Sequence, residues 1–246
     1  MQMSMPLNEN AKSVPAAKPA ANGRNGRKIW LSHTGLGGLD RCPRCFWLQY
    51  RQGIYQPEGI VSRLANRFDV LVKHYFDRFR GTDELPPIVA GHVEGRLESP
   101  FQEEYFYRVD DQYGFKGKLD ECLVRADGTY TPVDHKTSSS DPRIERAMYA
   151  SYQEQLDAYA FLLESNGKPT SGIGHLIYYY PDSTEDLHNG VQMAVVVKTL
   201  KTDPLSVLPR IKRGITVLEQ PIPDPSPECV FCIWRERVGN FIPAKL

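Results

Sequence analysis

The stretch that decides the fold is Asp120-Glu-Cys-Leu-Val-Arg-Ala-Asp-Gly-Thr-Tyr-Thr-Pro-Val-Asp-His-Lys136. Apolar and β-branched residues lie on both sides of Ala126-Asp127-Gly128, a segment typical of the turn between two antiparallel strands. We therefore predict a hairpin formed by residues 115–125 and 130–136. Glu103 to Val109 predicts a third strand, and we expect these three strands to form the centre of a sheet.

Strand geometry decides which polar side chains of the hairpin can meet. Asp134 and Lys136 are two residues apart and share a face, whereas His135 points to the opposite face and can offer only its carbonyl. A two-residue turn would pair Asp120 with His135. A three-residue loop with Gly128 in the left-handed conformation would instead pair Asp120 with Asp134, and we predict this register.

Two opposed carboxylates and a lysine are what hydrolysis of a phosphodiester needs. The carboxylates can share a divalent cation, which polarises the phosphoryl oxygen and activates water, and the lysine can act beside the nucleophile. The alternative is a pair of surface aspartates with Lys136 as a salt-bridge partner. The flanking Tyr130, Pro132 and Val133 indicate a buried strand, where charged groups are rare without a metal or mutual pairing.

The remaining periodicities predict an α/β fold of the restriction-endonuclease-like kind, with a mixed central sheet flanked by helices. Apolar residues recur at helical spacing from Val61 to Phe79 and from about Met148 to Glu164. Ile173 to Tyr180 and Val191 to Val197 predict two more strands, and a final helix is expected around Pro204 to Leu218.

Three motifs in this order resemble those of the RecB-like branch of the PD-(D/E)XK nucleases. They are Gly117-Lys-Leu-Asp120, Val133-Asp-His-Lys-Thr137 and Gln155-Leu-Asp-Ala-Tyr159. The resemblance covers most of Ser32 to Cys232, and the three motifs together are far more specific than any one.

The resemblance implies roles for particular residues. Asp120 and Asp134 would bind Mg²⁺ or Mn²⁺, and Lys136 would orient or deprotonate water. Gln155 and Tyr159 would support the site and contact the DNA, since residues four apart share a helical face. The family often adds a metal-binding histidine on the preceding helix, for which His74 is the candidate, although a lone histidine there is as readily structural. His135 stands where the family frequently has tyrosine.

Four cysteines form two chelating pairs, Cys42-x-x-Cys45 and Cys229-x-x-Cys232. Two such pairs can make one tetrahedral thiolate site that joins residues 36–50 to residues 225–240. The resemblance extends to AddB-like and CRISPR-adaptation nucleases, which bind a [4Fe-4S] cluster through four cysteines. Their usual division is one upstream and three downstream, so structural Zn²⁺ remains the alternative. Cys122 is expected to be a small core residue.

Composition bounds the remaining possibilities. With 30 basic and 30 acidic residues the net charge is zero, so DNA must be bound by a local patch. We expect residues 1–28 to be a disordered basic tail and residues 29–246 to form a single nuclease domain. No apolar run reaches the roughly 18 residues of a membrane span, and we expect a cytoplasmic protein with no membrane partner.

The leading hypothesis is a metal-dependent DNA nuclease, of exonuclease type on single strands or DNA ends, in recombination, repair or CRISPR adaptation. Basic residues near the motifs and on the last predicted helix could neutralise phosphates: Lys116, Lys118, Arg143, Arg146, Arg210, Lys212 and Arg213. Tyr178, Tyr179 and Tyr180 could stack on unpaired bases. The first alternative is a non-catalytic DNA-binding or scaffold subunit that retains the fold. The second is a zinc-bound interaction protein.

Overall fold

The computed structural model describes residues 28–57, 63–144, 150–182, 190–239 and 241. The expected N-terminal tail, apart from Lys28, lies outside these ranges, as do Val61 and Met148. In chain order the elements are β1 (Ile29–Leu31), α1 (His33–Arg41), α2 (Pro43–Trp47), the π-helical turn η2 (Leu48–Gln52), α3 (Arg63–Asp77), β2 (Arg96–Leu97), β3 (Glu104–Arg108), β4 (Tyr113–Lys118), β5 (Glu121–Val124), β6 (Tyr130–Thr137), α4 (Ala150–Ser165), β7 (Ile173–Pro181), β8 (Met193–Lys201), η3 (Pro204–Ser206), α5 (Val207–Glu219) and α6 (Val230–Gly239).

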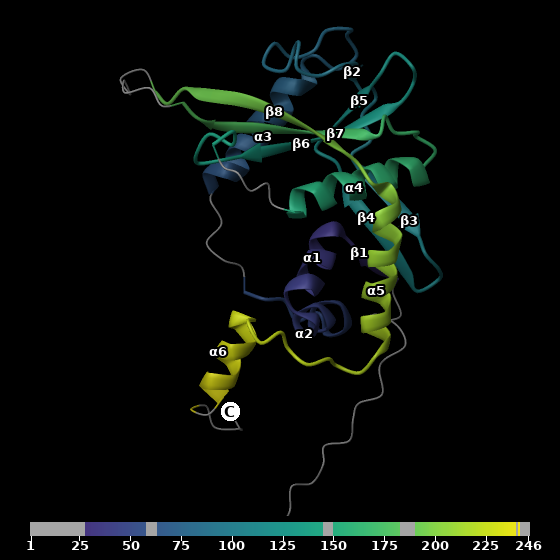
Figure 1. Ribbon diagram of the computed structural model, residues 1–246, viewed down its shortest axis with the longest axis vertical. Coiled ribbons are helices and arrows are strands. Elements are labelled where there is room, and N and C mark those ends of the chain that lie inside the picture. Colours follow the sequence, from purple (N-terminus) through teal and green to yellow (C-terminus); the bar gives the residue numbers. More distant parts are fainter. Residues whose placement is uncertain (1–27, 58–62, 145–149, 183–189, 240, 242–246) are drawn as a thin grey trace, which may run out of the picture.

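Two mixed sheets form the framework (Figure 1). The larger sheet has the order β2-β5-β6-β7-β8, with β6 in the middle, and the smaller has the order β1-β4-β3. Strands β6 and β7 are parallel and are joined through α4, whereas β5–β6 and β7–β8 are antiparallel. The fold is the expected α/β arrangement, a mixed sheet flanked by helices.

The continuous strand predicted for residues 115–125 is wrong. The chain leaves the small sheet at Lys118 and enters the large sheet at Glu121, with Leu119 and Asp120 at the bend. The Leu119 side chain is fully buried, and its amide donates to the Glu103 carbonyl at 2.9 Å. For the same reason β3 belongs to the smaller sheet rather than to the centre of a single sheet.

The hairpin register is the predicted one. Glu121 pairs with Val133 and Val124 with Tyr130, which places Asp120 opposite Asp134. Gly128 has φ 80°, the left-handed conformation expected at the end of the three-residue loop. A β-carbon is disfavoured at this φ, so glycine suits the position that sets the register.

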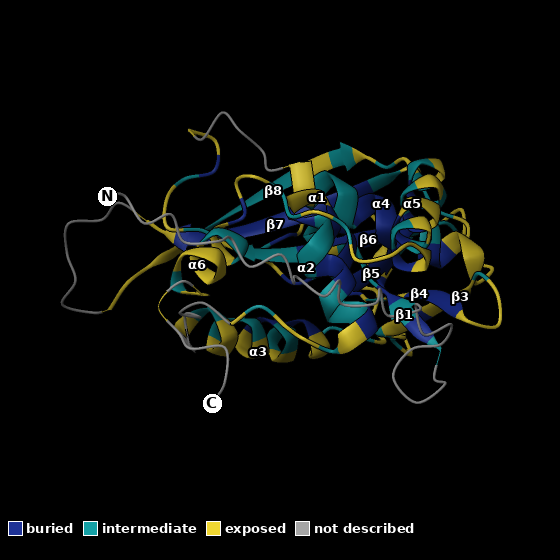
Figure 2. Cartoon of the chain, turned by 90° about the horizontal axis from the view of Figure 1, so that it is seen from below, coloured by how far each residue is buried: buried dark blue, intermediate teal, exposed yellow. Residues whose placement is uncertain are grey.

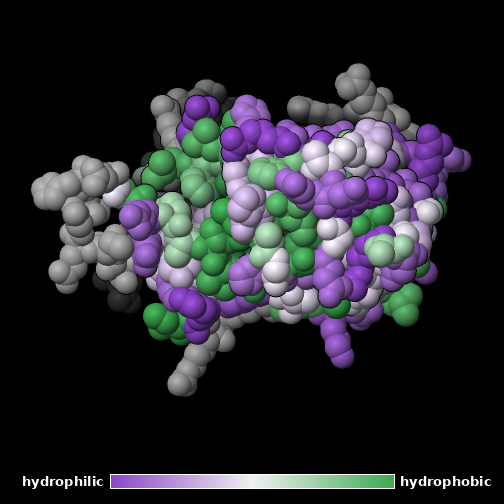
Figure 3. All heavy atoms as spheres, turned by 90° about the horizontal axis from the view of Figure 1, so that it is seen from above, coloured by the Kyte–Doolittle hydropathy of each residue, from purple (hydrophilic) through white to green (hydrophobic). Residues whose placement is uncertain are grey.

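Helices cover both faces of the larger sheet (Figure 2). Helix α4 packs on one face of β6 and β7, and α3 packs on the other face of β6. Strand alternation divides the apolar residues accordingly: Leu176 and Tyr178 belong to the cluster with α4, and Ile177 and Tyr179 to the cluster with α3. In the view from above, apolar residues gather on the surface, with hydrophilic residues on either side of them (Figure 3).

Several elements were not predicted from sequence. They are the short strands β1 and β2 and the helices α1, α2 and α6. Each cysteine pair spans the start of a helix: Cys42 and Cys229 directly precede α2 and α6, and Cys45 and Cys232 are the third residues of these helices. Helix α6 has no buried residue and lies apart from the sheets (Figure 1). Among the described residues, no helix is both long and apolar enough to cross a membrane.

Candidate active site

Two aspartates meet where the hairpin joins the bend between the sheets. Asp134 lies in β6 with its side chain completely buried, and Asp120 lies at the bend with its side chain 21% exposed. The register places them opposite each other, so both carboxylates reach one site. Asp120 lies at the bend where the predicted strand is interrupted, and it is therefore the carboxylate that solvent can reach.

A closed set of polar contacts links Asp134 to α4. The Lys136 Nζ lies 2.5 Å from Asp134 Oδ2 and donates to Gln155 Oε1 at 2.9 Å. Gln155 Nε2 lies 2.7 Å from the Tyr159 hydroxyl, which in turn donates to Asp134 Oδ1 at 3.4 Å. Gln155 and Tyr159 are four residues apart on one helical face, so α4 presents both to the strand. All five residues expected to be catalytic are thus brought together.

Burial gives Asp134 unusual electrostatics. Desolvation raises its pKa to about 7, an effect that Lys136 opposes and the neighbouring Asp120 reinforces. Its Oδ2 is in an ion pair with Lys136 but has no hydrogen-bond partner among the residues that the structure describes. A divalent cation between the carboxylates would relieve their repulsion and coordinate this oxygen. The donor set therefore fits a Mg²⁺ or Mn²⁺ ion.

His135 points away from the carboxylates, as predicted. Its ring packs against Phe76, and its Nδ1 lies 3.1 Å from the Tyr179 hydroxyl. Burial lowers its pKa to about 4, so the imidazole is neutral at neutral pH. Its amide donates to Asp120 Oδ2 at 3.2 Å. Because the amide and carbonyl of one strand residue point to the same edge, the carbonyl also faces the end of β5, where Asp120 lies.

The expected metal ligand on α3, His74, does not face the site. His74 is exposed, and it is two residues from each of the buried Val72 and Phe76, which places it on the opposite side of the helix. Lys73 faces the carboxylates instead. Its Nζ lies 3.3 Å from Asp120 and 3.2 Å from Asp69.

Sequence reasoning missed Lys73, although a signal for it exists. Asp69 and Lys73 form an (i, i+4) pair that borders the apolar stripe of α3 instead of lying on its solvent side. Burial lowers the pKa of Lys73, but Asp120 and Asp69 outweigh this effect and raise it, so the ammonium stays charged. Tyr152 was also missed: the Lys136 Nζ lies 4.8 Å from the centre of its ring.

The four paired cysteines come together at the other end of the molecule. Their four Sγ atoms all lie within 4.8 Å of one another, and they belong to Cys42, Cys45, Cys229 and Cys232. The Cys45 Sγ is 3.6 Å from both Cys229 Sγ and Cys232 Sγ, and Cys42 Sγ is 3.9 Å from Cys232 Sγ. Zn–S bonds of about 2.3 Å in a tetrahedron place sulfurs about 3.8 Å apart, so four thiolates here fit one ion.

Polar contacts reinforce this junction of the two chain segments. Arg44 Nε donates to the Pro223 carbonyl at 2.9 Å, and Trp47 Nε1 donates to the Gln220 carbonyl at 3.0 Å. Arg51 Nε donates to the Leu218 carbonyl at 2.7 Å. Cys122 is separate from the group and lies fully buried in β5, as expected of a core residue.

The expected DNA contacts are only partly available. Tyr178, Tyr179 and Tyr180 are each at least 94% buried, so in this conformation they cannot stack on bases. Among the basic residues expected near the DNA, Arg210 and Arg213 both pair with Asp40. Arg146 lies outside the described residues.

A model of one protein family matches the part of the chain that carries the candidate site. The family model described as the PD-(D/E)XK nuclease superfamily matches residues 64–237. This range contains both aspartates, Lys136 and the two residues on α4. No curated protein matches the sequence.

Solved structures resemble the chain at low identity. The structure titled SSO0001 is 19% identical, with 89% of this chain and 88% of that chain covered at a TM-score of 0.45. The alkaline exonuclease LHK-Exo of Laribacter hongkongensis is 10% identical, with 86% and 94% covered at a TM-score of 0.43. A phage-related exonuclease from Haemophilus somnus 129PT is 12% identical, with 72% and 77% covered at a TM-score of 0.43.

Proposed function

Because the chain belongs to the PD-(D/E)XK nuclease superfamily, we propose that it is a Mg²⁺- or Mn²⁺-dependent deoxyribonuclease. The observation that carries this proposal is the set of contacts joining Asp134, Lys136, Gln155 and Tyr159, with Asp120 opposite. The alternative of an ordinary surface salt bridge does not explain why Asp134 is fully buried beside a second carboxylate, because burying a charge is costly. Exonuclease action on single strands or DNA ends, in recombination, repair or CRISPR adaptation, is the form of activity proposed.

Asp120 and Asp134 would hold the divalent ion through their carboxylates, and the His135 carbonyl is the third proposed ligand. When bound, the ion polarises the phosphoryl oxygen and lowers the pKa of the attacking water. Asp134 must lose its proton to serve as a ligand, so ion binding is coupled to its raised pKa. Lys73 must give up its contact with Asp120, since the ammonium occupies part of the space beside that carboxylate.

Lys136 is proposed to orient the nucleophilic water and to stabilise charge that develops on the phosphate. Gln155 accepts a hydrogen bond from Lys136 and fixes the direction of its ammonium group. Tyr159 is 5% exposed, and burial, reinforced by Asp134, raises its pKa well above the usual range. It therefore remains a neutral hydrogen-bond donor that positions Asp134.

The four-cysteine group is proposed to hold a structural metal that ties both ends of one nuclease domain, residues 29–246, together. A [4Fe-4S] cluster is what the AddB-like resemblance implies. Its thiolates bind different irons and must lie farther apart than thiolates that share one ion. Three of the sulfur–sulfur separations are 3.6–3.9 Å and all lie within 4.8 Å, which favours Zn²⁺. An absorbance band near 400 nm in anaerobically purified protein would instead support the cluster.

A cleavage assay tests the proposed activity. Single- and double-stranded DNA labelled at the 5′ or 3′ end is incubated with wild type or Asp134→Ala, with Mg²⁺, Mn²⁺ or EDTA. Wild type should cut only with a divalent ion, and the variant should lose most activity. Equal cutting by both proteins would refute the assignment. DNA binding without cutting under any ionic condition would support the non-catalytic alternative.

A further inference from the structure

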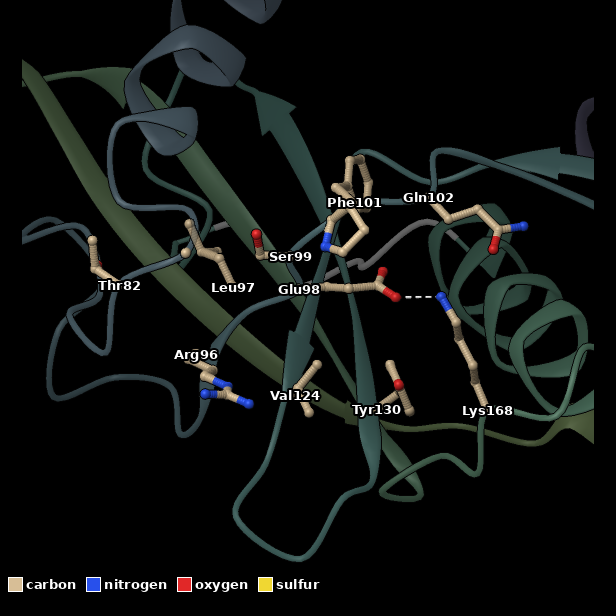
Figure 4. Close-up of a pocket in the computed structure, with 12 residues that line it drawn as sticks. Thr82, Arg96, Leu97, Glu98, Ser99, Phe101, Gln102, Val124, Tyr130 and Lys168 are labelled. Atoms are coloured by element: carbon tan, nitrogen blue, oxygen red, sulfur yellow. Dashed lines mark hydrogen bonds and ion pairs between the residues drawn. The ribbon is translucent and has the colours of Figure 1, made fainter.

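A cavity separate from the carboxylate site opens beside the edge strand β2 (Figure 4). Its volume is about 690 Å³, within the range of about 300–1,000 Å³ typical of small-ligand sites. Tyr130 lines it from the first position of β6, on the same face as Asp134. Four residues at about 3.3 Å each place the two positions about 13 Å apart along the strand.

A buried ion pair forms one wall of this cavity. The Lys168 ammonium pairs with Glu98 Oε1 and donates to the Tyr105 hydroxyl at 2.5 Å. The Glu98 side chain is only 8% exposed, and within the described part of the chain its second oxygen, Oε2, has no hydrogen-bond partner. A buried carboxylate oxygen without a donor is costly, so this oxygen would be stabilised by a hydrogen bond from a bound ligand. The terminal torsion of glutamate is broad, so a small rotation can turn this oxygen toward a ligand.

The rest of the lining combines aromatic rings with a second cation. Phe101 and Tyr130 contribute rings, and Figure 4 shows Arg96 and Lys168 on opposite sides of Glu98. The Arg96 side chain is 62% exposed, and its Nη1 lies 3.6 Å from the carboxylate of Asp83, whose side chain is 95% exposed. Such an exposed pair is weak, so the Arg96 guanidinium is available to an anion.

We propose that this cavity binds one nucleotide unit of DNA. The base lies against Tyr130 and donates an N–H group to Glu98, while the phosphate faces Arg96. A nucleobase is planar and carries hydrogen-bond donor and acceptor atoms side by side, which match the accepting Glu98 carboxylate and the donating Lys168 ammonium. Aromatic side chains bind bases of any sequence by stacking. The inference rests on the proposed function, since a nuclease supplies this ligand either as part of the substrate strand or as a released mononucleotide.

The test measures binding to the full-length protein without added Mg²⁺ or Mn²⁺, so that cleavage is prevented and the metal proposed at the four cysteines stays bound. A fluorescently labelled single-stranded 12-mer is titrated by anisotropy, and 2′-deoxynucleoside 5′-monophosphates are titrated by calorimetry. Tyr130→Phe, which keeps the ring, is compared with Tyr130→Leu, which removes it. Arg96→Gln is compared with Arg237→Gln, a matched control on the exposed helix α6.

Tyr130→Leu should weaken binding by about tenfold, the effect of losing one stacked base, and Tyr130→Phe should change it less than twofold. Arg96→Gln should reduce the salt dependence of oligonucleotide binding by about one phosphate contact, whereas Arg237→Gln should not. If only the oligonucleotide is affected, the ligand is part of the strand. If the mononucleotides are affected as well, the site also holds released product.

Unchanged affinities and salt slopes in both Tyr130→Leu and Arg96→Gln would overturn the inference. Arg96 is exposed, so Arg96→Gln keeps the test decisive if Tyr130→Leu fails to fold. The cleavage assay with wild type is read separately. Cutting without nucleotide binding in this cavity refutes only the second site, and nucleotide binding here without any cutting refutes only the proposed catalysis.

Discussion

In the metal-free protein, Asp134→Asn should increase the free energy of unfolding, and by more at pH 8 than at pH 5. Burial raises the pKa of Asp134 from 3.8 to about 7. Between these values the unfolded chain has released this proton while the folded protein retains it, so stability falls as pH rises. At about 1.4 kcal/mol per pKa unit the full effect is about 4 kcal/mol, and more than half of it falls between pH 5 and pH 8.

The assay is urea denaturation of wild type and Asp134→Asn in EDTA at several pH values. Asparagine cannot ionise, so the difference between the two proteins should grow with pH and level off above pH 7. Asp83→Asn serves as the control, because the Asp83 side chain is 95% exposed. Adding Mg²⁺ at pH 8 should stabilise wild type but not Asp134→Asn. A difference that does not vary with pH would refute the reasoning.

Three further substitutions test other parts of the structure. Lys73→Met should tighten Mg²⁺ binding severalfold in isothermal titration, since the ammonium 3.3 Å from Asp120 no longer competes; unchanged or weaker binding would contradict this. Cys229→Ser should lower the melting temperature and the metal content measured by elemental analysis, and an unchanged metal-to-protein ratio would argue against the four-cysteine site. Gly117→Ala should destabilise by about 1–3 kcal/mol in urea denaturation, because the new β-carbon would lie 2.6 Å from Leu162 Cδ1; a neutral effect would show that Leu162 can move freely.

Short-range sequence patterns predicted much of the candidate site. Alternation along β6 placed Asp134 and Lys136 on one face and His135 on the other, and the contacts agree. The helical period of α4 likewise placed Gln155 and Tyr159 together. These predictions succeeded because side-chain direction within one strand or helix follows from local backbone geometry.

Prediction failed where an interaction with a distant element decided the outcome. The strand expected to continue through Leu119 breaks there because the two halves pair with different neighbours. His74 and Lys73 are adjacent on one helix, and periodicity alone left the histidine as the candidate ligand. Only the packing of Val72 and Phe76 on the sheet showed that Lys73 faces Asp120.

The sequence by itself determined the identity and order of the acidic, basic and amide groups, the hairpin register and the two chelating cysteine pairs. The tertiary structure decided which α3 residue reaches the carboxylates, and it brought together cysteines separated by 190 positions. It also formed the cavity around Glu98, which directly follows β2, and Lys168, which lies in the loop after α4. Local geometry fixes where a side chain points, whereas the packing of the whole chain fixes what it meets.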